Sequence, residues 1–373
     1  EFHNPLIAAS GTFGFGREYA EFYPLSALGG ISSKGITLKA RPGNPAPRIA
    51  EAPGGMLNAV GLQNPGVDHF IEKDLPWLRE QGVTIIANIA GNTPEDYCAM
   101  AEKLNDTDID MIEMNISCPN VKCGGMAFGT QPKMVEEVVS AAKAKAKKPL
   151  IVKLSPNVTD IAEIARAAES AGADALSLIN TLLGMRIDIE KRKPILSNVM
   201  GGLSGPAVFP VAVRMVYQVR KAVSVPILGM GGIRTGRDIV EMMLAGADAV
   251  AMGTVMFNDP TAPVKALAEL NEWLDAHGVT YADRHIVEDN PTADELRTWH
   301  ERSGLPLKRF FNTSGMVYRE RNVKALLDAG MGDEEAYALL AEDGMLVKRP
   351  LVVGEGFVLV GFKEAEWEQA LLG

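Results

Sequence analysis

Six polar residues follow short apolar runs within the first 180 residues, and their side chains could bind an anionic or amide-rich ligand. They are Ser10, Lys34, Asn88, Asn115, Lys153 and Asn180. An apolar run has no packing reason to end repeatedly in Asn or Lys, although a single Asn often starts a turn. If the runs are strands of one barrel, their ends lie on one rim and the six side chains converge. We therefore interpret them as a functional site.

The two lysines allow two chemistries. A buried lysine can form a Schiff base, as in aldolase-like or phosphate-sugar barrel enzymes. Alternatively, Lys34 and Lys153 are fixed cations that stabilise an anion, such as a reduced flavin or a substrate carboxylate. The asparagines favour the second chemistry, because three amides can bind a flat, amide-rich heterocycle. The spacing alone leaves both open.

Glycine-containing pairs follow the last two apolar runs, Gly231-Gly232 after one and Gly253-Thr254 after the other. A Gly-rich turn lets backbone N–H groups approach a phosphate at a helix N-terminus, a position where barrels often bind one. A single pair is equally consistent with a plain tight turn. Two pairs on adjacent strands favour a phosphate site.

Cys118 lies in a polar loop, NISCPN at residues 115–120, directly before a proline. A free cysteine is most often a small buried hydrophobe. In this loop it could instead be a general base, a nucleophile or a metal ligand. Cys118 and Cys123 lack the two-residue gap of zinc sites and no histidine is near, so we expect no metal site.

Eight apolar runs alternate with amphipathic segments over the first 279 residues. The runs are 6–10, 30–34, 84–89, 111–116, 150–153, 175–180, 226–229 and 249–253. Near-continuous apolar strands are typical of a parallel sheet that is buried on both faces. The alternation predicts an α/β fold, a closed (β/α)₈ TIM barrel of about 250 residues. An open doubly wound sheet is the alternative.

Composition places the chain among cytoplasmic globular proteins. The net charge of −10 argues against nucleic-acid and anionic-membrane surfaces, and no run is long and apolar enough to cross a bilayer. Three cysteines cannot staple a chain of 373 residues with disulfides. The sequence opens on Glu1 without a signal peptide, and we expect some natural N-terminal residues to be missing. Charged residues rise from about a fifth before Val279 to nearly a third after it, which predicts a domain boundary at 279/280.

Several motifs in residues 1–279 resemble class 1 dihydroorotate dehydrogenases, most closely the class 1B catalytic subunit. They are NPLIAASGTFGFG (4–16), SKGIT (33–37), NAVGLQNPG (58–66), NISCPNVKCGGMAFG (115–129), INT (179–181) and GMGGI (229–233). The resemblance implies oxidation of dihydroorotate to orotate in pyrimidine (UMP) synthesis, with FMN in the barrel mouth. The implied FMN contacts are Ser10, Lys34, Gly35, Asn88, Asn115, Lys153, Ile179, Gly205, Gly231, Gly232, Gly253 and Thr254.

The same resemblance implies a substrate site and a base. The implied substrate contacts are Lys34, Asn58, Ala59, Val60, Gly61, Leu62, Asn115, Asn180 and Thr181. Cys118 would be the general base that takes the proton from C5 of the substrate. A thiol with a reference pKa of ~8.5 must be partly ionised for this task, which a cationic rim assists.

Class 1B enzymes imply a partner subunit that carries FAD and a [2Fe–2S] cluster and passes electrons to NAD⁺. This chain cannot hold the cluster, because four thiolates are needed and it has three scattered cysteines. We expect a homodimer of this subunit within a heterotetramer. Two relatives remain alternatives: dihydropyrimidine dehydrogenases, which act on substrates without the carboxylate, and class 1A enzymes, which use fumarate and no partner.

Residues 280–373 resemble a different family, the arsenate reductase and Spx-like proteins of the thioredoxin fold. The similar stretches are PLKRFFN (306–312) with the following TSG, and LVKRPL (346–351). The first strand of that fold and its cysteine loop are absent, and residues 280–373 contain no cysteine. We therefore expect a truncated, partial thioredoxin-like segment, joined by natural fusion or by an assembly artefact, that is inert or binds a partner rather than acting as a reductase. A complete four-stranded thioredoxin sheet there would contradict the truncation.

Overall fold

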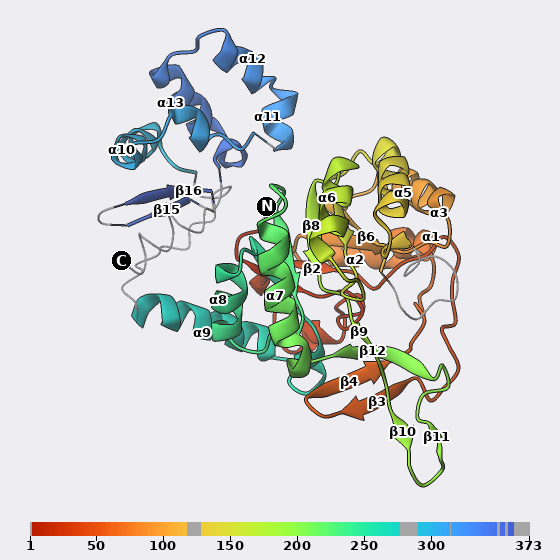
Figure 1. Ribbon diagram of the computed structural model, residues 1–373. Coiled ribbons are helices and arrows are strands. Elements are labelled where there is room, and N and C mark those ends of the chain that lie inside the picture. The colour runs from red at the N-terminus through yellow and green to blue at the C-terminus, as the bar shows by residue number, and fades with distance from the viewer. Residues whose placement is uncertain are drawn as a thin grey trace. The chain divides into compact units, whose positions relative to one another are not determined.

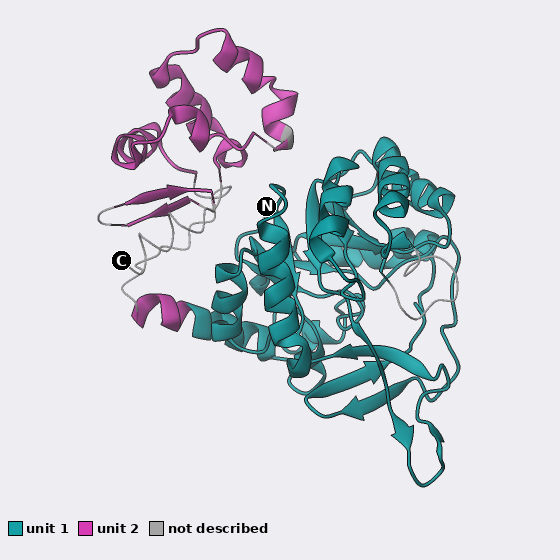
Figure 2. Ribbon diagram, viewed as in Figure 1, with its two compact units in different colours: residues 1–270 teal, residues 271–373 magenta. Residues whose placement is uncertain are grey.

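The computed structural model describes residues 2–117, 128–276, 290–313, 315–348, 351–354 and 357–361. It divides into two compact units, residues 1–270 and 271–373, and the division falls within helix α9 (Ala262–Ala276) (Figure 2). The boundary predicted at 279/280 lies outside the described residues, as does Cys118.

Eight parallel strands close the first unit into a barrel, which confirms the predicted fold class (Figure 1). In chain order they are β1 (Leu6–Ala8), β2 (Gly30–Ser32), β5 (Ile85–Ile89), β6 (Met111–Asn115), β7 (Leu150–Lys153), β8 (Ala175–Leu178), β13 (Ile227–Met230) and β14 (Ala249–Met252). The strand order is that of the chain, and β14 pairs with β1 to close the ring. Because every strand is parallel, all eight carboxyl ends lie on one rim.

In the first unit the helices lie outside the barrel and cover its strands (Figure 1). The helices described there are α1 (Val67–His69), α2 (Leu75–Glu80), α3 (Pro94–Leu104), α5 (Pro132–Lys145), α6 (Ile161–Ser170), α7 (Phe209–Arg220), α8 (Gly236–Leu244) and the greater part of α9. α6 buries its apolar face as its spacing predicts, and Gly172 directly after it has φ +97°, the conformation of a helix C-terminus. No described helix is long and apolar enough to cross a bilayer.

Aspartates fix the amino-terminal ends of several strands. The sequence Ala-Gly-Ala-Asp occurs before β8 and again before β14. In the first copy the Asp174 carboxylate accepts the Leu150 N–H at 2.8 Å, and in the second Asp248 accepts the Ile227 N–H at 2.8 Å. Each aspartate therefore joins the start of its own strand to the start of its neighbour, at the end of the barrel opposite the rim.

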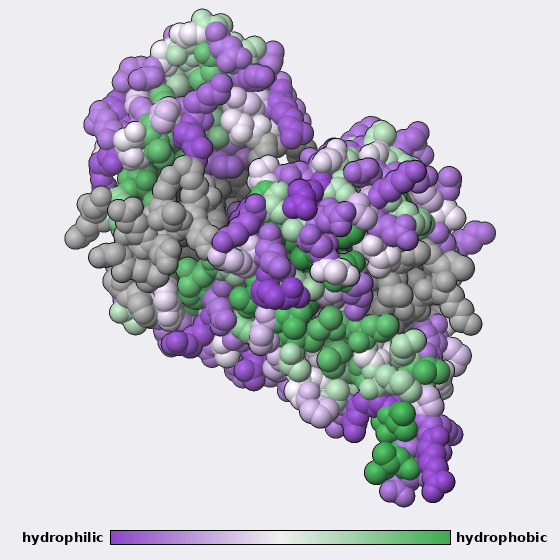
Figure 3. Space-filling view, viewed as in Figure 1, coloured by the Kyte–Doolittle hydropathy of each residue, from purple (hydrophilic) through white to green (hydrophobic). Residues whose placement is uncertain are grey.

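A second sheet, which the sequence analysis did not anticipate, is built from β3 (Ile49–Ala52), β4 (Gly55–Asn58), β12 (Met200–Ser204) and β9 (Leu182–Met185), in that order. A two-stranded arm, β10 (Ile187–Asp188) and β11 (Lys193–Pro194), projects beyond it (Figure 1). Exposed apolar side chains gather on this sheet and arm (Figure 3), among them Ile49, Met185, Ile187 and Ile189.

The second unit has its own apolar core, formed by residues such as Leu296, Phe310, Phe311, Tyr337 and Leu340. Besides the end of α9, the helices in its described part are α10 (Ala293–Ser303), α11 (Met316–Glu320), α12 (Val323–Asp328) and α13 (Asp333–Glu342). Within the described part of this unit the strands are β15 (Leu351–Val353) and β16 (Val358–Val360), which pair antiparallel. The described part of the second unit thus contains a two-stranded sheet and not a four-stranded one.

Candidate active site

A layer of polar side chains lies inside the barrel, one step nearer the rim than an apolar layer. The apolar layer includes Ile86 on β5, Met111 on β6, Ile151 on β7 and Ala175 on β8. Side chains two residues apart on a strand point to the same face. The polar layer therefore consists of Asn88, Glu113, Lys153 and Ser177, all of which are buried.

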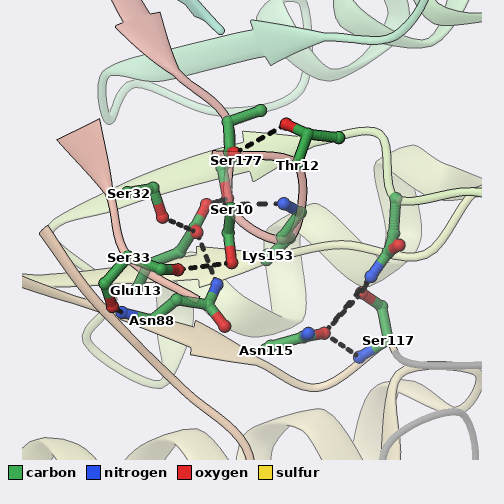
Figure 4. Close-up of polar contacts among 12 residues, drawn as sticks. Ser10, Thr12, Ser32, Ser33, Asn88, Glu113, Asn115, Ser117, Lys153 and Ser177 are labelled. Carbon is green, nitrogen blue, oxygen red and sulfur yellow. Dashed lines mark hydrogen bonds and ion pairs between the residues drawn. The ribbon is translucent and has the colours of Figure 1, made fainter. Parts of the chain in front are cut away.

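Glu113 is the centre of this layer and is fully buried. Its carboxylate accepts hydrogen bonds from Ser32 Oγ at 2.7 Å, Ser177 Oγ at 2.7 Å and Asn88 Nδ2 at 2.6 Å (Figure 4). Lys153 Nζ lies 4.0 Å from Glu113 Oε1. Burial raises the pKa of the Glu113 carboxyl, but the Lys153 ammonium and the three hydrogen bonds outweigh burial and hold the pKa below its ordinary value.

The sequence analysis missed Glu113, Ser32 and Ser177. A signal was present, because Glu113 is the one charged residue in the apolar run 111–116. Charged side chains are almost never fully buried unless they are paired. A carboxylate inside a predicted barrel strand therefore requires a buried cation, and Lys153 at the end of the next strand supplies it.

Asn88 carries an unsatisfied acceptor that faces the rim. Its amide nitrogen is held by Glu113, and its backbone N–H donates to Ser33 Oγ at 3.1 Å. The side-chain oxygen Oδ1 is buried and has no hydrogen-bond partner within the described residues. A Cβ on Gly35 would lie 3.2 Å from this oxygen and 3.1 Å from Leu62 Cδ2. Because buried polar atoms are rarely left unpaired, Asn88 Oδ1 points to a ligand with a hydrogen-bond donor.

The predicted residues at the ends of β1 and β2 adjoin Asn88. Ser10 Oγ donates to the Ser33 carbonyl oxygen at 2.6 Å, and the Lys34 N–H donates to the Gly14 carbonyl oxygen at 2.9 Å. Lys34 also lines a hollow of about 830 Å³, together with residues that follow β1 and β14 such as Thr12 and Phe257. Of the predicted site residues that the structure describes, Lys34 alone lines this hollow, so the hollow flanks the polar layer and is not its centre.

Two side-chain amides and one hydroxyl join the ends of β6 and β8. Asn115 Oδ1 accepts from Asn180 Nδ2 at 3.2 Å and from Ser117 Oγ at 3.1 Å. Asn180 Nδ2 also donates to Ser117 Oγ at 2.7 Å, and Asn180 Oδ1 accepts the Thr181 N–H at 2.7 Å. Ser117 directly precedes Cys118, so this network anchors the described end of the loop in which the predicted base lies.

The second sheet brings the segment 58–62 to the same rim. Asn58 Nδ2 donates to the Gly202 carbonyl oxygen at 3.4 Å, and a Cβ on Gly202 would overlap Thr181 Oγ1 at 2.0 Å. Ala59 is fully buried, the Val60 carbonyl oxygen accepts the Asn44 N–H, and Asn44 also fills the space beside Gly61. The predicted substrate residues are therefore continuous in space from Asn58 to Asn180.

Glycines form a tight cradle at the ends of β13 and β14. A Cβ on Gly231 would lie 3.0 Å from Ile179 Cγ1, and one on Gly232 would lie 2.8 Å from the Gly205 carbonyl oxygen. Beside them, Thr254 Oγ1 donates to Ser204 Oγ at 2.9 Å. Gly253 lies beside the end of β1, because a Cβ on Gly253 would be 3.5 Å from Ala9 Cβ. The predicted cofactor residues thus lie along the rim or, as Asn88 and Lys153 do, in the polar layer directly beneath it.

We expect Gly232→Ala to destabilise the barrel more than the matched substitution Gly82→Ala. Gly232 has φ +81° and its Cβ would lie 2.8 Å from Phe209 Cβ, whereas Gly82 has φ +65° with nothing within 4 Å. Both variants carry the cost of a positive φ, about 1 kcal/mol, and only Gly232→Ala adds a clash of about 1–3 kcal/mol. Urea unfolding measures both, and equal losses would contradict a cradle at Gly232.

Two protein-family models match parts of this chain. The model of the family "Dihydroorotate dehydrogenase" matches residues 1–274, and that of the "ArsC family" matches residues 217–370. The chain is 61% identical to the dihydroorotate dehydrogenase B (NAD(+)) catalytic subunit of Alkaliphilus metalliredigens over 279 residues, which are 75% of this chain and 92% of that protein. It is 57% identical to the subunit of the same name from Bacteroides thetaiotaomicron, over 74% of this chain and 91% of that one.

A solved structure shows the same similarity. Dihydroorotate dehydrogenase from Eimeria tenella, in complex with ferulenol, superposes with a TM-score of 0.63 at 25% identity. The match covers 74% of this chain and 83% of the Eimeria chain. The sequence and structure comparisons thus each match about three quarters of the chain, which the family model places at residues 1–274.

Proposed function

Because this chain belongs to the dihydroorotate dehydrogenase family, we propose that residues 1–279 bind FMN and oxidise (S)-dihydroorotate to orotate in de novo pyrimidine (UMP) synthesis. The observation that carries the proposal is the buried polar layer, in which Lys153 supplies a cation and Asn88 Oδ1 an unsatisfied acceptor directly beneath the rim. A flat heterocycle with hydrogen-bond donors on its edge suits both groups.

The residues present fit FMN. Asn88 Oδ1 can accept from a ring N–H, and the Lys153 ammonium favours negative charge beside it. In the glycine cradle Gly231 and Gly232 are partly exposed, so their backbone could approach a phosphate, while the buried Gly205 packs against Gly232 and Thr254 adds a hydroxyl. Ser10, Lys34, Gly35, Asn115, Ile179 and Gly253 complete the proposed contacts. When bound, FMN supplies the acceptor for the hydride that leaves C6 of the substrate.

The chain's own groups bind the substrate and take its proton. In the proposal Asn58, Asn115, Asn180 and Thr181 bind the dihydroorotate ring, and the network around Asn115 Oδ1 holds these amides in place. Lys34 and the segment Ala59, Val60, Gly61 and Leu62 complete the pocket. Cys118, as a thiolate, accepts the proton from C5.

The ion pair argues against a Schiff base on Lys153. Lys153 faces a buried carboxylate that hydrogen bonds hold in its ionised form. Such a pair suits a fixed cation and not a neutral, nucleophilic amine. The stabilisation of an anion is therefore the chemistry that we retain for Lys153.

A partner subunit is part of the proposal. The relatives are named as catalytic subunits of an NAD(+)-dependent enzyme, which supports a separate electron-transfer subunit for this chain. We propose that the partner holds FAD and a [2Fe–2S] cluster and passes electrons to NAD⁺, that this subunit forms the homodimeric core of a heterotetramer, and that the assembly is cytoplasmic. With three cysteines in all, this chain has too few thiolates for such a cluster.

For residues 280–373 we propose an inert or partner-binding segment, fused to the enzyme, rather than a reductase. The two family models overlap over residues 217–274, which supports a junction in a helix where the families locally agree. The segment has no cysteine, and arsenate reductase chemistry depends on one. The proposal leaves the barrel with the whole of the catalytic activity.

We expect the purified full chain to be yellow and its flavin to be bleached by dihydroorotate without oxygen. Bleaching by dihydrouracil should be slower by about a hundredfold or more, because the site would leave groups for the missing carboxylate unpaired. Stopped-flow absorbance measures both rates. A colourless protein that FMN cannot reconstitute would refute the proposal, and equal rates would favour a dihydropyrimidine dehydrogenase. Rapid reoxidation by fumarate without a partner would favour class 1A.

A further inference from the structure

The buried carboxylate of Glu113 is a charged group to which the proposed reaction gives no role. It lies in the polar layer beneath the rim, and it accepts hydrogen bonds from Ser32, Asn88 and Ser177, which are not among the groups proposed to bind substrate. An isolated buried charge is costly, and this one is ionised only because three donors and Lys153 compensate it. A fully satisfied buried network of this kind fixes the orientation of each of its members.

Two of those members face the proposed flavin. Glu113 accepts from Asn88 Nδ2 at 2.6 Å, and the amide can therefore present only Oδ1 to the rim. Glu113 also lies 4.0 Å from Lys153 Nζ, so its negative charge partly cancels the field of that ammonium at the rim. The carboxylate thus controls both the hydrogen-bonding direction of one contact and the net charge of the other.

We propose that Glu113 is a positioning residue that limits how strongly the site stabilises negative charge on the bound flavin. The proposal rests on FMN being bound at this rim. With Glu113 ionised, the layer of Asn88, Glu113, Lys153 and Ser177 is close to neutral. Without its charge, Lys153 acts uncompensated and the site favours an electron-rich flavin.

Glu113→Gln tests the charge with little change of shape. The Gln carbonyl oxygen can still accept from Ser32 and Asn88, and the Ser177 hydroxyl can turn to accept from the new amide. The probe is sulfite, an anion that adds reversibly to the flavin ring and bleaches its absorbance. We expect sulfite to bind Glu113→Gln about tenfold or more tightly than wild type, as one nearby unit charge requires.

Two controls separate charge from shape. Glu113→Asp keeps the charge but shortens the side chain, and its sulfite affinity should stay within about threefold of wild type. Glu169→Gln removes the same charge at the other end of the barrel, where Glu169 accepts from the Ser224 and Val225 N–H groups just before β13. It too should leave sulfite affinity within about threefold, because distant charges are screened. A merely structural role would make the Asp variant as abnormal as the Gln variant.

The outcomes are distinguishable. Wild-type protein that takes up no FMN contradicts the proposed function itself. FMN-loaded Glu113→Gln with unchanged sulfite affinity, or with the same change in Glu169→Gln, overturns the inference and leaves the proposed function standing. If Glu113→Gln does not fold, the double variant Lys153→Met/Glu113→Gln replaces it. It removes both charges, so its sulfite affinity should stay within about threefold of wild type, and a loss of about tenfold or more would show that Glu113 does not compensate Lys153.

Discussion

Cys118→Ser should lower the rate of flavin reduction by dihydroorotate at neutral pH by about 10²–10⁴-fold, the usual contribution of a general base. A serine hydroxyl stays protonated where a thiol is partly ionised, so it cannot accept the C5 proton. FMN should remain bound, because the proposed flavin contacts lie on other residues. Anaerobic stopped-flow reduction and the flavin-to-protein absorbance ratio measure the two properties in one sample.

Cys98→Ser is the matched control for this variant. Cys98 lies in α3, half-buried, and burial raises the pKa of its thiol, with Glu102 and Glu95 adding to the effect against Lys145. A thiol with a raised pKa is protonated at neutral pH and is no base. We expect Cys98→Ser to reduce flavin at the wild-type rate. Normal reduction by Cys118→Ser would remove Cys118 from the mechanism, and equal losses in both variants would point to a general effect on folding.

The barrel could be predicted from sequence because its signal is local. Each strand is a short apolar run, and parallel strands that are buried on both faces tolerate few polar residues. The polar ends of those runs, such as Asn88 and Lys153, therefore stood out against an apolar background. A closed parallel barrel has one carboxyl rim, so the convergence of these residues followed from the fold class alone.

The second sheet could not be predicted in the same way. Its strands come from residues 49–58 and 182–204, and β3 alternates between exposed and half-buried positions. Short strands with glycines, such as Gly201 and Gly202 of β12, give a weak pattern, and their pairing depends on contacts that are far apart in the chain. The resemblance placed Asn58 and Thr181 in one site, but only the sheet explains how they meet.

The burial and pairing of Glu113 could not be predicted from the sequence for a different reason. One glutamate in an apolar run can mark a strand end, an error in the predicted strand or a buried pair. Only the register decides, because it places Glu113 beside Asn88 on β5 and one strand from Lys153 on β7. Lys153 was predicted as a contact of the flavin, whereas its pairing with Glu113 was seen only in the structure.

That pairing leads to the largest expected effect on stability. Lys153→Met should lower the free energy of unfolding of the flavin-free chain by about 3–5 kcal/mol, because it leaves the Glu113 carboxylate buried without its cation. Adding Glu113→Gln should restore most of the loss, since a buried pair that is replaced on both sides is often close to neutral. Urea unfolding followed by Trp77, with Trp273, Trp299 and Trp367 changed to Phe, reports on the barrel alone.

The loss of stability in Lys153→Met should depend on pH. In wild type the folded-state pKa of Glu113 is depressed, so its contribution to stability is present above the unfolded value of about 4.3 and is lost as the pH falls through the folded value. In Lys153→Met the carboxyl keeps its burial but loses its cation, so we expect its pKa to rise and its cost to grow as the pH increases from 5 to 8. The deficit of the single variant should therefore be smaller at pH 5 than at pH 8, and Glu113→Gln should remove that difference. A deficit that is equal at both pH values, or a double variant as unstable as Lys153→Met, would show that Lys153 stabilises the barrel by packing and not as the counterion of Glu113.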